Sequence, residues 1–534
     1  MPDVTIDNRH VSVPDGSTVL DAASALGIEI PTLCHYPGCA PQNSCLVCVV
    51  SINGSDRLEP SCSTRVVEGM TVQNDCDTVR AARRTALELL LSDHAGDCIA
   101  PCQNTCPAHM DIPLMLRQIG EGDLAEALIT VKRDIPLPAV LGRICPAPCE
   151  SGCRRSASDD PVSVCMLKRY VADQDLATGS PFVPPRQPDS GKRVAIIGAG
   201  PTGLSAAYYL QQSGHQCVVF DDQDQPGGML RYGVPEEAPE RDVLDGEIDI
   251  VRQLGAEFRM NTRIGHDLTL QQLRDDYDAV LLAVGHIDDQ LGGALGVTMS
   301  DHGIAAERAT FRTDLPGVFA AGGSVRQTRL AVRSVADGKD AAVQIDRHLA
   351  GNTGLVVLDT YNSLMGRLRE DELADYMLGA PELERITPAG GLKRGYGPDE
   401  ALTEAQRCLQ CDCSAACDCR IRQYATQYEA DRNRFRGTRR RFERRVRASD
   451  VIYEPGKCIA CGLCVEITRQ AGEPLGVTFV GRGFDVRIAT PNDQSISDGL
   501  GRVAAECIDA CPTGSLVFAG GTSASCGSHP PPTE

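Results

Sequence analysis

The chain has 534 residues, 25 of them cysteine, and a formal net charge of −20 at pH 7. This length exceeds one domain, and the negative charge argues against nucleic acid or an anionic membrane as a partner. No apolar run is long enough to span a bilayer, and the start, MPDVTIDNRH, lacks the basic and apolar regions of a secretory signal. We therefore expect a multidomain cytoplasmic protein with no membrane span.

The cysteines cluster at gaps of two or three residues. In a long chain without an export signal, such gaps favour metal clusters over disulfides. Iron–sulfur ligation is the working interpretation, and zinc is the alternative.

Residues 1–80 are predicted to form a small β-rich domain. Short alternating runs such as VTIDN and LVCVVSI surround four cysteines at C-x10-C-x2-C-x13-C spacing. A single C-x2-C pair with two distant cysteines fits a [2Fe-2S] cluster better than a zinc site. The residues CHYPGCAPQNSCLVC resemble the N-terminal ferredoxin domain of the complex I large iron–sulfur subunit (NADH dehydrogenase 75 kDa type), which implies a β-grasp fold. The expected ligands are Cys34, Cys45, Cys48 and Cys62.

Residues 81–185 are predicted to form a helical iron–sulfur domain. The segment LLSDHAGDC resembles the complex I segment that carries a cluster bound by one histidine and three cysteines, and that family continues with C-x2-C-x5-C. This chain departs from the pattern, because Cys98 is followed by Cys102 and Cys106 at x3 gaps. Whether His94 is a ligand or a surface or capping residue stays open.

From Cys102 onward the resemblance changes. CQNTCPAHMDIP and RICPAPCESGC resemble the small subunit of glutamate synthase and dihydropyrimidine dehydrogenase. That resemblance implies two [4Fe-4S] clusters, each with ligands from both cysteine groups. One cluster would use Cys98, Cys102 and Cys153, with His94 as a candidate fourth ligand, and the other would use Cys106, Cys145 and Cys149.

The fourth ligand of the second cluster is a Glu or Gln in that family. Lys168 appears at about that place here, and an ammonium group cannot bind iron. Cys165 lies one helical turn earlier on the same face. We hypothesise that Cys165 replaces the carboxylate.

Residues 190–350 carry a dinucleotide motif. An apolar run from Val194 to Ile197 precedes a GxGxxG turn, a helical pattern and a second apolar run that ends in Asp221. This is the order of a Rossmann βαβ unit, whose glycines let a pyrophosphate approach the helix N-terminus. The segments PGGMLRYGVP, YDAVLLAVG and LPGVFAAGG resemble the FAD domain of the glutamate synthase small-subunit family. The expected FAD-binding residues are Gly198, Gly200, Pro201, Gly203, Asp221, Gly227, Gly228, Met229, Gly322, Gly323 and Ser324.

Two departures from that family affect the expected function. The stretch between Gly285 and LPGVFAAGG is too short for the second Rossmann domain that binds NADPH there. Ser324 stands where the family has an Asp that holds the ribityl chain, so this FAD contact is lost or is supplied by Ser324. We expect a redox-active FAD without an NAD(P) domain; a structural flavin or an empty fold is the alternative.

Residues 351–450 are predicted to connect the flavin domain to the C-terminal domain. EAQRCLQC resembles segments in relatives of the glutamate synthase small subunit, and a [4Fe-4S] cluster is favoured over zinc here. The expected ligands are Cys408, Cys411, Cys413 and Cys419, with Cys417 as the alternative to Cys419. The run from Asp431 to Arg447 holds nine arginines and is predicted to be a docking surface for an acidic partner, with a solvated helical face as the alternative.

Residues 451–520 resemble the ferredoxin region of the complex I large iron–sulfur subunit. KCIACGLCVEI and ECIDACPTGSL supply a complete C-x2-C-x2-C…C-P set for one [4Fe-4S] cluster. Thr468, Gly501 and Ala504 occupy ligand positions of a second cluster, so Cys507 is a leftover thiol. The expected ligands are Cys458, Cys461, Cys464 and Cys511. Residues 521–534, with Cys526, are predicted to be disordered.

The sequence predicts no catalytic residue of its own. We expect an iron–sulfur/FAD electron-transfer subunit of a multisubunit oxidoreductase, with one [2Fe-2S] cluster, three to four [4Fe-4S] clusters and FAD. The expected partners are a catalytic subunit of formate dehydrogenase or hydrogenase type and a separate NAD(P)/FMN subunit or ferredoxin. A flavin-based bifurcating, ferredoxin-linked reductase and a scaffold with vestigial cofactors are the alternatives.

Overall fold

The computed structural model describes residues 1–234, 239–326, 330–352, 360–378, 380–444 and 451–519. The chain divides into two compact units. Unit 1 comprises Met1–Ile99, Leu358–Gly379 and Cys411–Glu534, and unit 2 comprises Ala100–Val357 and Ala380–Gln410. Unit 2 is therefore an insertion in unit 1. The tail predicted to be disordered, 521–534, lies outside the described residues.

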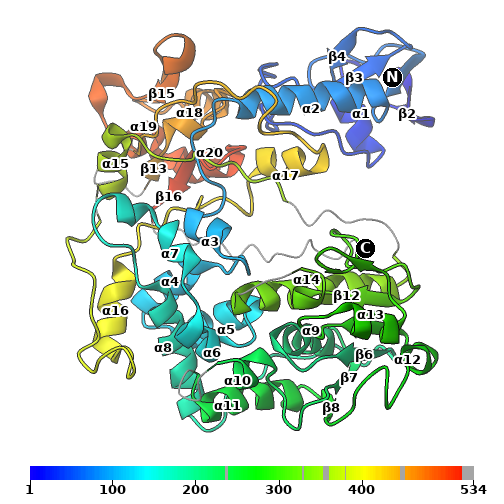
Figure 1. Ribbon diagram of the computed structural model, residues 1–534. Coiled ribbons are helices and arrows are strands. Elements are labelled where there is room, and N and C mark those ends of the chain that lie inside the picture. Colours follow the sequence, from blue (N-terminus) through cyan, green and yellow to red (C-terminus); the bar gives the residue numbers. More distant parts are fainter. Residues whose placement is uncertain (235–238, 327–329, 353–359, 379, 445–450, 520–534) are drawn as a thin grey trace. The chain divides into compact units, whose positions relative to one another are not determined.

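The N-terminal part of unit 1 is a five-stranded sheet with one short helix (Figure 1). The strand order is β2-β1-β5-β3-β4; β1 and β5 run parallel, and the other neighbours run antiparallel. Helix α1 begins with a capping box in which Thr18 and Asp21 satisfy each other's backbone N–H groups. The bounds are β1 (Asp3–Ile6), β2 (Arg9–Ser12), α1 (Val19–Ala25), β3 (Val49–Ile52), β4 (Leu58–Pro60) and β5 (Met70–Gln73).

The remainder of unit 1 combines helices from three separate stretches of the chain. Helix α2 packs against α17, and α18 packs against α20 beside the antiparallel pair β13 and β16. Buried residues from these elements form one apolar core. The bounds are α2 (Asp77–Leu91), α15 (Glu370–Met377), α17 (Arg420–Gln427), β13 (Val451–Tyr453), α18 (Leu463–Ala471), β14 (Thr478–Val480), β15 (Arg487–Ala489), α19 (Ile496–Leu500), α20 (Ala504–Ala510) and β16 (Leu516–Phe518).

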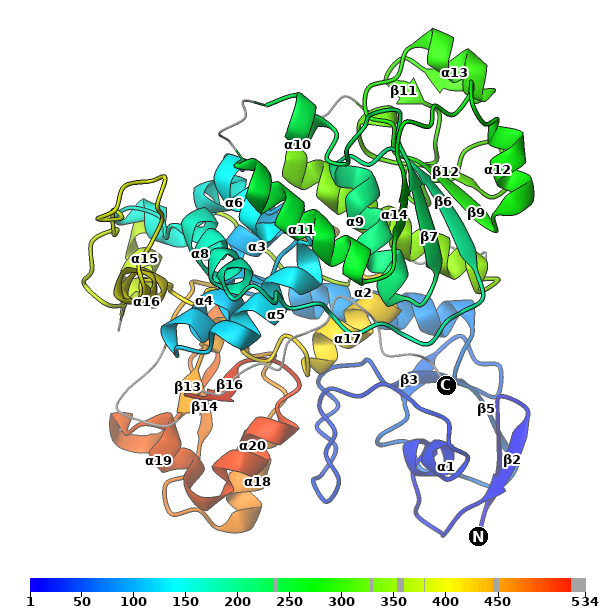
Figure 2. The same ribbon diagram turned by 90° about the horizontal axis from the view of Figure 1, so that it is seen from below.

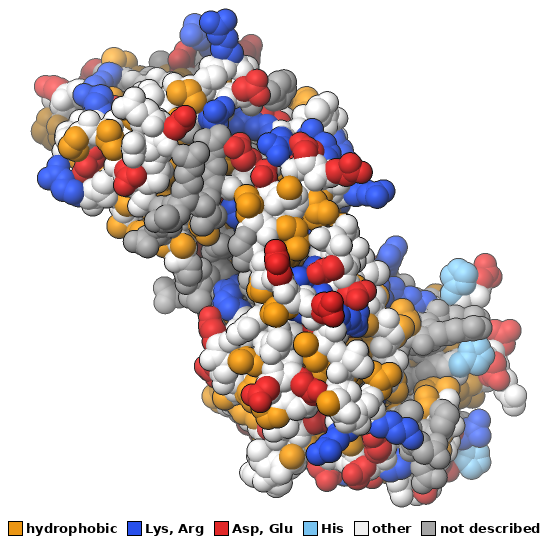
Figure 3. Space-filling view, turned by 90° about the vertical axis from the view of Figure 1, so that its left-hand side faces the viewer, with side chains coloured by type: hydrophobic (Ala, Val, Ile, Leu, Met, Phe, Trp, Pro, Cys, Tyr) orange, Lys and Arg blue, Asp and Glu red, His pale blue; other side chains and the backbone are white. Residues whose placement is uncertain are grey.

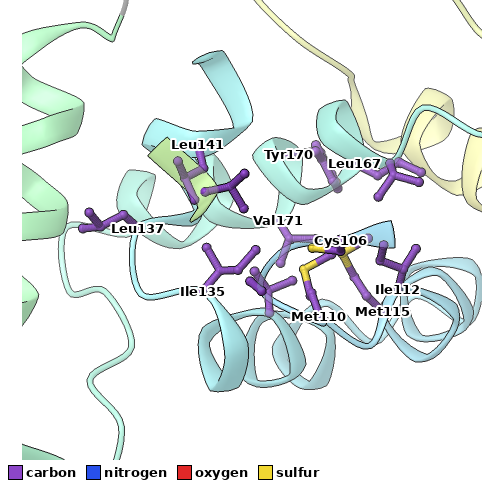
Figure 4. Packing of buried hydrophobic residues seen from close by; sticks show 14 of the residues in the cluster. Cys106, Met110, Ile112, Met115, Ile135, Leu137, Leu141, Leu167, Tyr170 and Val171 are labelled. Atoms are coloured by element: carbon purple, nitrogen blue, oxygen red, sulfur yellow. The ribbon is translucent and has the colours of Figure 1, made fainter. Parts of the chain in front are cut away.

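Unit 2 begins with short helices around a second apolar core. Figure 4 shows Cys106 among Met110, Met115, Ile135 and Val171 in this core. Five of these helices have proline at the first or second position, where the missing N–H costs nothing. The bounds are α3 (Pro101–Thr105), α4 (Ile112–Gly120), α5 (Leu124–Asp134), α6 (Pro138–Ile144), α7 (Pro148–Ser151), α8 (Val164–Ala177) and α16 (Pro398–Gln406).

The rest of unit 2 is a parallel five-stranded sheet of order β12-β9-β6-β7-β8. Helices α9, α11 and α14 cover one face, and α12 and α13 cover the other (Figure 2). The βαβ order predicted from the sequence is present as β6, α9 and β7. The bounds are β6 (Arg193–Ile197), α9 (Pro201–Gln212), β7 (Gln216–Phe220), α10 (Met229–Tyr232), α11 (Arg241–Gln253), β8 (Glu257–Arg259), α12 (Leu270–Asp276), β9 (Ala279–Leu282), α13 (Asp289–Leu295), β10 (Met299–Ser300), β11 (Gly303–Ile304), β12 (Val318–Ala320) and α14 (Ala331–Leu349).

Candidate metal centres and dinucleotide site

The four N-terminal cysteines converge next to the sheet of unit 1. Cys34 and Cys45 lie in the connection between α1 and β3, Cys48 directly precedes β3, and Cys62 follows β4. The Sγ atoms of Cys34 and Cys45 are 3.3 Å apart, and those of Cys48 and Cys62 are 3.5 Å apart. Contact with the neighbouring thiol lowers the pKa of Cys34 to about 5 and that of Cys48 to about 6. The same contacts and burial raise the pKa of the partners Cys45 and Cys62, so each pair favours one thiolate, the form that binds metal. Leu46, between Cys45 and Cys48, has a positive φ and an exposed side chain.

Other cysteines line cavities of about 310 to 380 Å³. Among the described residues, no three His, Cys, Asp or Glu side chains are arranged to hold a single metal ion. Each cavity is therefore considered by the side chains that surround it.

The largest of these cavities, about 380 Å³, lies in the C-terminal part of unit 1. The predicted ligands Cys458, Cys461, Cys464 and Cys511 all line it, and so does Cys507. Cys464 is on α18, Cys507 is on α20, and Cys511 follows α20 directly. The structure therefore brings together the four residues that the spacing predicts, and adds Cys507 as a fifth thiol.

A cavity of about 350 Å³ in unit 1 combines residues that the sequence interpretation assigned to separate clusters. His94, Cys98, Cys413 and Cys419 all line it. Burial lowers the pKa of His94 to about 4, which keeps the imidazole neutral, the state that binds metal. The backbone N–H of Ser363 donates to the Cys98 Sγ at 3.3 Å.

The predicted grouping of Cys98 with Cys102 and Cys153 differs from this arrangement, because Cys98 belongs to unit 1 and the other two belong to unit 2. One signal for the observed grouping is visible in the sequence. Cys413 and Cys419 have the x5 gap that ends the complex I pattern, and Cys98 follows His94 at the x3 gap that begins it. Because chain of unit 2 lies between the two halves of that pattern, the pattern is not evident from local spacing.

The cavity of about 310 Å³ in unit 2 is lined by Cys106, Cys145, Cys149 and Cys165. Cys106 follows α3, Cys145 follows α6, Cys149 is on α7, and Cys165 is on α8. The Cys165 Sγ lies 3.6 Å from the carbonyl oxygen of Leu141. Its position among the other three cysteines fits the hypothesis that it replaces a carboxylate ligand.

Cys102, Cys153 and Cys408 pack against the same core of unit 2. Helices α3 and α7 approach so closely that a Cβ at Gly152 would lie 2.5 Å from the Thr105 Oγ1. Arg155 Nη1 donates to the carbonyl oxygen of Arg407 at 2.8 Å, which joins the turn after Cys153 to the turn before Cys408. The predicted set Cys408, Cys411, Cys413 and Cys419 is therefore divided, since Cys411, Cys413 and Cys419 belong to unit 1.

The dinucleotide turn in unit 2 has the expected backbone geometry. Gly198 has a φ of +109°, and a Cβ there would lie 2.3 Å from the carbonyl oxygen of Ala283. Gly203 abuts Gly198, because its Cβ would lie 1.9 Å from that residue's carbonyl oxygen. Pro201 starts α9, as the sequence predicts for the helix facing the pyrophosphate. The Asp221 carboxylate accepts from the N–H of Ala199 at 2.6 Å, which fixes it beside the turn.

Three further glycine turns converge on this one. A Cβ on Gly228 would lie 2.7 Å from the Gly200 Cα, one on Gly322 would lie 2.2 Å from the Thr202 Oγ1, and one on Gly323 would lie 3.3 Å from the Gly285 carbonyl carbon. A side chain at Gly228 or Gly322 would collide with its neighbours. The backbone is therefore left open to close approach by a dinucleotide pyrophosphate.

The remaining predicted FAD residues differ in whether contacts within the protein already engage them. The Gly227 N–H donates to the carbonyl oxygen of Ala199 at 2.9 Å, and Met229 is exposed. The Ser324 hydroxyl donates to backbone carbonyls of Leu282 and Ala321 and is fully buried. Its hydroxyl is thus engaged by the protein itself.

The arginine run is bound within unit 1. Arg439 pairs with Glu372, Arg440 with Asp93, Arg441 with Asp371, Arg434 with Glu88 and Arg444 with Glu454. Figure 3 shows basic and acidic side chains interspersed over the face drawn. These ion pairs brace unit 1, and the docking surface expected for this run stays a prediction; Arg445 and Arg447 lie outside the described residues.

None of the described helices is long and apolar enough to cross a bilayer.

Models of three domain families match separate parts of the chain. The 2Fe-2S iron-sulfur cluster binding domain matches residues 3–76, dihydropyrimidine dehydrogenase domain II with its 4Fe-4S cluster matches 86–180, and pyridine nucleotide-disulphide oxidoreductase matches 184–338. The chain therefore carries iron–sulfur domains of both kinds and an oxidoreductase domain of the flavin-binding type, as the sequence predicts.

Curated relatives match about a third of the chain. The NADP(+)-dependent formate dehydrogenase subunit beta of Moorella thermoacetica is 42% identical over 36% of this chain and 31% of its own length. The glutamate synthase (NADPH) small chain of Mycobacterium tuberculosis is 38% identical over 35% of this chain and 39% of its own. The NAD-dependent dihydropyrimidine dehydrogenase subunit PreT of Escherichia coli is 36% identical over 40% of this chain and 52% of its own. The chain spans about half or less of these relatives, all named as subunits or chains of larger enzymes, and the expected resemblance is confirmed.

Proposed function

We propose that this chain is an iron–sulfur/FAD electron-transfer subunit of a multisubunit cytoplasmic oxidoreductase. The observation that carries the proposal is the convergence of cysteines into separate groups inside two apolar cores. Bound there, iron–sulfur clusters would carry single electrons, and FAD would exchange between one-electron and two-electron steps. A cytoplasmic location suits the many cysteines that form no disulfide among the described residues, because that compartment is reducing.

The donor chemistry of each group fits one cluster type. Four thiols next to the N-terminal sheet fit a [2Fe-2S] cluster, and four ligands around a larger cavity fit [4Fe-4S]. The proposed [4Fe-4S] sets are Cys458, Cys461, Cys464 and Cys511; His94, Cys98, Cys413 and Cys419; and Cys106, Cys145, Cys149 and Cys165. Cys102, Cys153 and Cys408 would hold a further cluster in unit 2. Cys411, at C-x2-C spacing from Cys408, stays a predicted ligand.

Three of these sites share the core of unit 1. Cys45, Cys461 and Cys419, one from each site, belong to the same set of contacting buried residues. Cys34 is also an electrostatic neighbour of Cys461, and Cys511 of Cys419. This arrangement supports a relay with the C-terminal site adjacent to both of the others.

In unit 2, helix α14 links a cysteine cavity to the dinucleotide turn. Val332 lines the cavity of Cys106 and Cys165. Six residues further along, Gly338 lies so close to α9 that a Cβ would be 2.3 Å from the Thr202 carbonyl oxygen. Six residues of helix span about 9 Å. One rigid helix therefore contacts both sites, which supports electron transfer between them.

The site for pyridine nucleotide is proposed to lie on another subunit. Between β9 and β12 the described residues form only α13 and the β10–β11 hairpin, where the glutamate synthase family has its NADPH domain. We propose a catalytic subunit of formate dehydrogenase or hydrogenase type and a separate NAD(P)- or ferredoxin-reacting subunit as partners. The relatives named as formate dehydrogenase and glutamate synthase subunits support the first part of this proposal.

Anaerobic titration of the cofactor-loaded chain tests the proposal. Dithionite should bleach the flavin and the clusters, and neither NADH nor NADPH should bleach the flavin rapidly. Iron analysis and native mass spectrometry should show iron and FAD in the chain and identify its partners. Rapid flavin reduction by either nucleotide, or a colourless protein that holds zinc, would overturn the proposal.

A glycine substitution tests the FAD site separately. Gly228→Ala should lose FAD and keep its iron, because the new Cβ would collide with the Gly200 Cα. Gly293→Ala on α13 is the matched control, since no atom lies within 4 Å of its Cβ position. Equal FAD content in both variants would contradict the assignment.

A further inference from the structure

A buried lysine lines the cavity of the four cysteines in unit 2. Lys168 is on α8, three residues after Cys165, so both side chains are on the same helix face. Only 4% of its surface is exposed. The lysine thus faces Cys106, Cys145 and Cys149 as well as Cys165.

The remaining lining of this cavity is apolar. Met110, Ile135, Val164 and Val332 complete it together with two prolines. An ammonium group placed in such surroundings costs free energy unless opposite charge compensates it. A structural role alone would be better served by an apolar side chain.

Four cysteines line the cavity with Lys168, and the negative charge of cluster-bound thiolates would compensate its ammonium group. A lysine side chain carries a positive charge at neutral pH. Glu150 also faces Cys145 and Cys149. Its carboxylate, however, is bound by Arg385 at 2.8 Å and by the Cys165 N–H at 3.1 Å.

We propose that Lys168 sets the reduction potential of the cluster held by Cys106, Cys145, Cys149 and Cys165. The inference rests on the function proposed above. A [4Fe-4S] cluster gains one negative charge on reduction, and its potential depends on net charge and on its surroundings. A fixed ammonium group in a low-dielectric cavity stabilises the reduced form more than the oxidised form. Lys168 therefore acts on the cluster through its positive charge and does not bind iron.

A lysine also lies beside the His94 site, in a different electrostatic setting. Lys457 Nζ lies 3.4 Å from the Cys413 Sγ. This ammonium forms an ion pair with the buried carboxylate of Glu454, which also binds Arg444 at 3.0 Å. The carboxylate partly neutralises Lys457, whereas Lys168 faces the cysteines of its own cavity.

Redox titration of the full cofactor-loaded chain, followed by EPR, tests the proposal. Cys149→Ser identifies the signal of this cluster by its loss. In Lys168→Leu, which removes the charge and adds no donor atom, the iron content should be unchanged, and the reduced-to-oxidised ratio of this cluster at a fixed potential should fall at least tenfold. For a one-electron couple that is a midpoint about 59 mV more negative. Lys168→Arg should stay close to the wild type.

Lys132→Gln is the matched control. Lys132 is also buried in unit 2, but it pairs with Asp175 and the carbonyl oxygen of Phe182, and it does not line the cavity. Its replacement should leave the midpoint unchanged.

A wild-type midpoint in Lys168→Leu with full iron content overturns the role of Lys168 alone. If Cys149→Ser removes no signal, the cluster assignment fails, and the inference fails with it. Should Lys168→Leu lose the cluster, Lys168→Arg decides: retention supports a role of the charge, and an equal loss indicates packing and overturns the proposal.

Discussion

The C-terminal cavity and the His94 cavity of unit 1 have similar sizes but differ in how the chain supplies their side chains. The C-terminal cavity takes all its cysteines from one stretch, 458–511, with α18 and α20 packed against each other. The His94 cavity takes His94 and Cys98 from before unit 2, and Cys413 and Cys419 from after it. A local site forms with its own helices, whereas an interrupted site also requires the inserted chain to close a long loop.

A third stretch of the chain braces the interrupted site. The Ser363 N–H donates to Cys98, and the Met365 N–H donates to Asp97 at 2.8 Å. Arg439 binds the carbonyl oxygen of Met365 and the carboxylate of Glu372 on α15. The stretch from 360 to 378 therefore holds the first half of the site in place.

The largest predicted effect is a loss of iron that distinguishes the two possible groupings of Cys98, with Cys413 or with Cys102. Cys98→Ala and Cys413→Ala should each remove one [4Fe-4S] cluster, which contains four irons, and the double variant should lose no more iron than either single variant. Cys98→Ala with Cys102→Ala should lose two clusters, because the residues belong to different units. Iron per chain and EPR spin counts measure this.

The opposite result has a clear meaning. If Cys98 and Cys102 behave as one site and Cys98 and Cys413 as two, the grouping from local spacing holds, and the contrast between the two cavities disappears.

The next largest effect concerns the stability of the His94 site, which Glu372 braces. Glu372 is fully buried and accepts hydrogen bonds from Arg439, the Phe442 N–H and the Arg369 N–H. Glu372→Gln should destabilise this part of unit 1 by about 3–5 kcal/mol, because Arg439 would remain without its charge partner. On heating, the EPR signal of the His94 site should disappear before that of the C-terminal site. Glu370→Gln, exposed on the same helix, is the control; equal losses at both sites would contradict the bracing role.

A smaller effect on stability is expected in unit 2, where a carboxyl group is buried. Among the described residues, no arginine donates a hydrogen bond to it. Glu247 on α11 accepts from the N–H groups of Ala139 and Val140, which start the helix that leads to Cys145. Burial raises its pKa from 4.5 to about 7, although these bonds and the charges of Lys132 and Arg143 oppose the shift.

Because the folded protein holds this proton more tightly, the stabilisation is complete below pH 4.5 and is lost as pH rises through 7. The free energy of unfolding of unit 2 should fall by up to about 3 kcal/mol across this window. Glu247→Gln should flatten that slope, and Asp249→Asn, exposed on the same helix, should keep it. Thermal melts between pH 4.5 and 7.5 measure the difference; parallel curves for wild type and Glu247→Gln would contradict the prediction.

The sequence was sufficient where the chemistry is local. The spacing around Cys45 and Cys48, the glycine turn at Gly198 and the C-x2-C-x2-C run at Cys458 each predict residues that the structure brings together. It was insufficient where two distant stretches combine. The x3 gap at Cys98 and the x5 gap at Cys413 are present in the sequence, but a whole unit separates them, so local spacing grouped Cys98 with Cys102 and Cys153. The ion pairs of the arginine run could not be predicted for a related reason: partners such as Asp93 and Glu372 are remote in sequence.

The smallest predicted effect tests the local site. Five thiols line the C-terminal cavity, and one of them, Cys507, has no place in the ferredoxin spacing. Cys507→Ala should keep all the iron and cost about 1 kcal/mol, because it removes one buried sulfur from a packed core. Cys511→Ala should lose a cluster. If instead Cys507→Ala loses the iron and Cys511→Ala keeps it, then the fold and not the spacing selects the ligand, even where all candidates are close in sequence. The local site would then share the property that distinguishes the interrupted one.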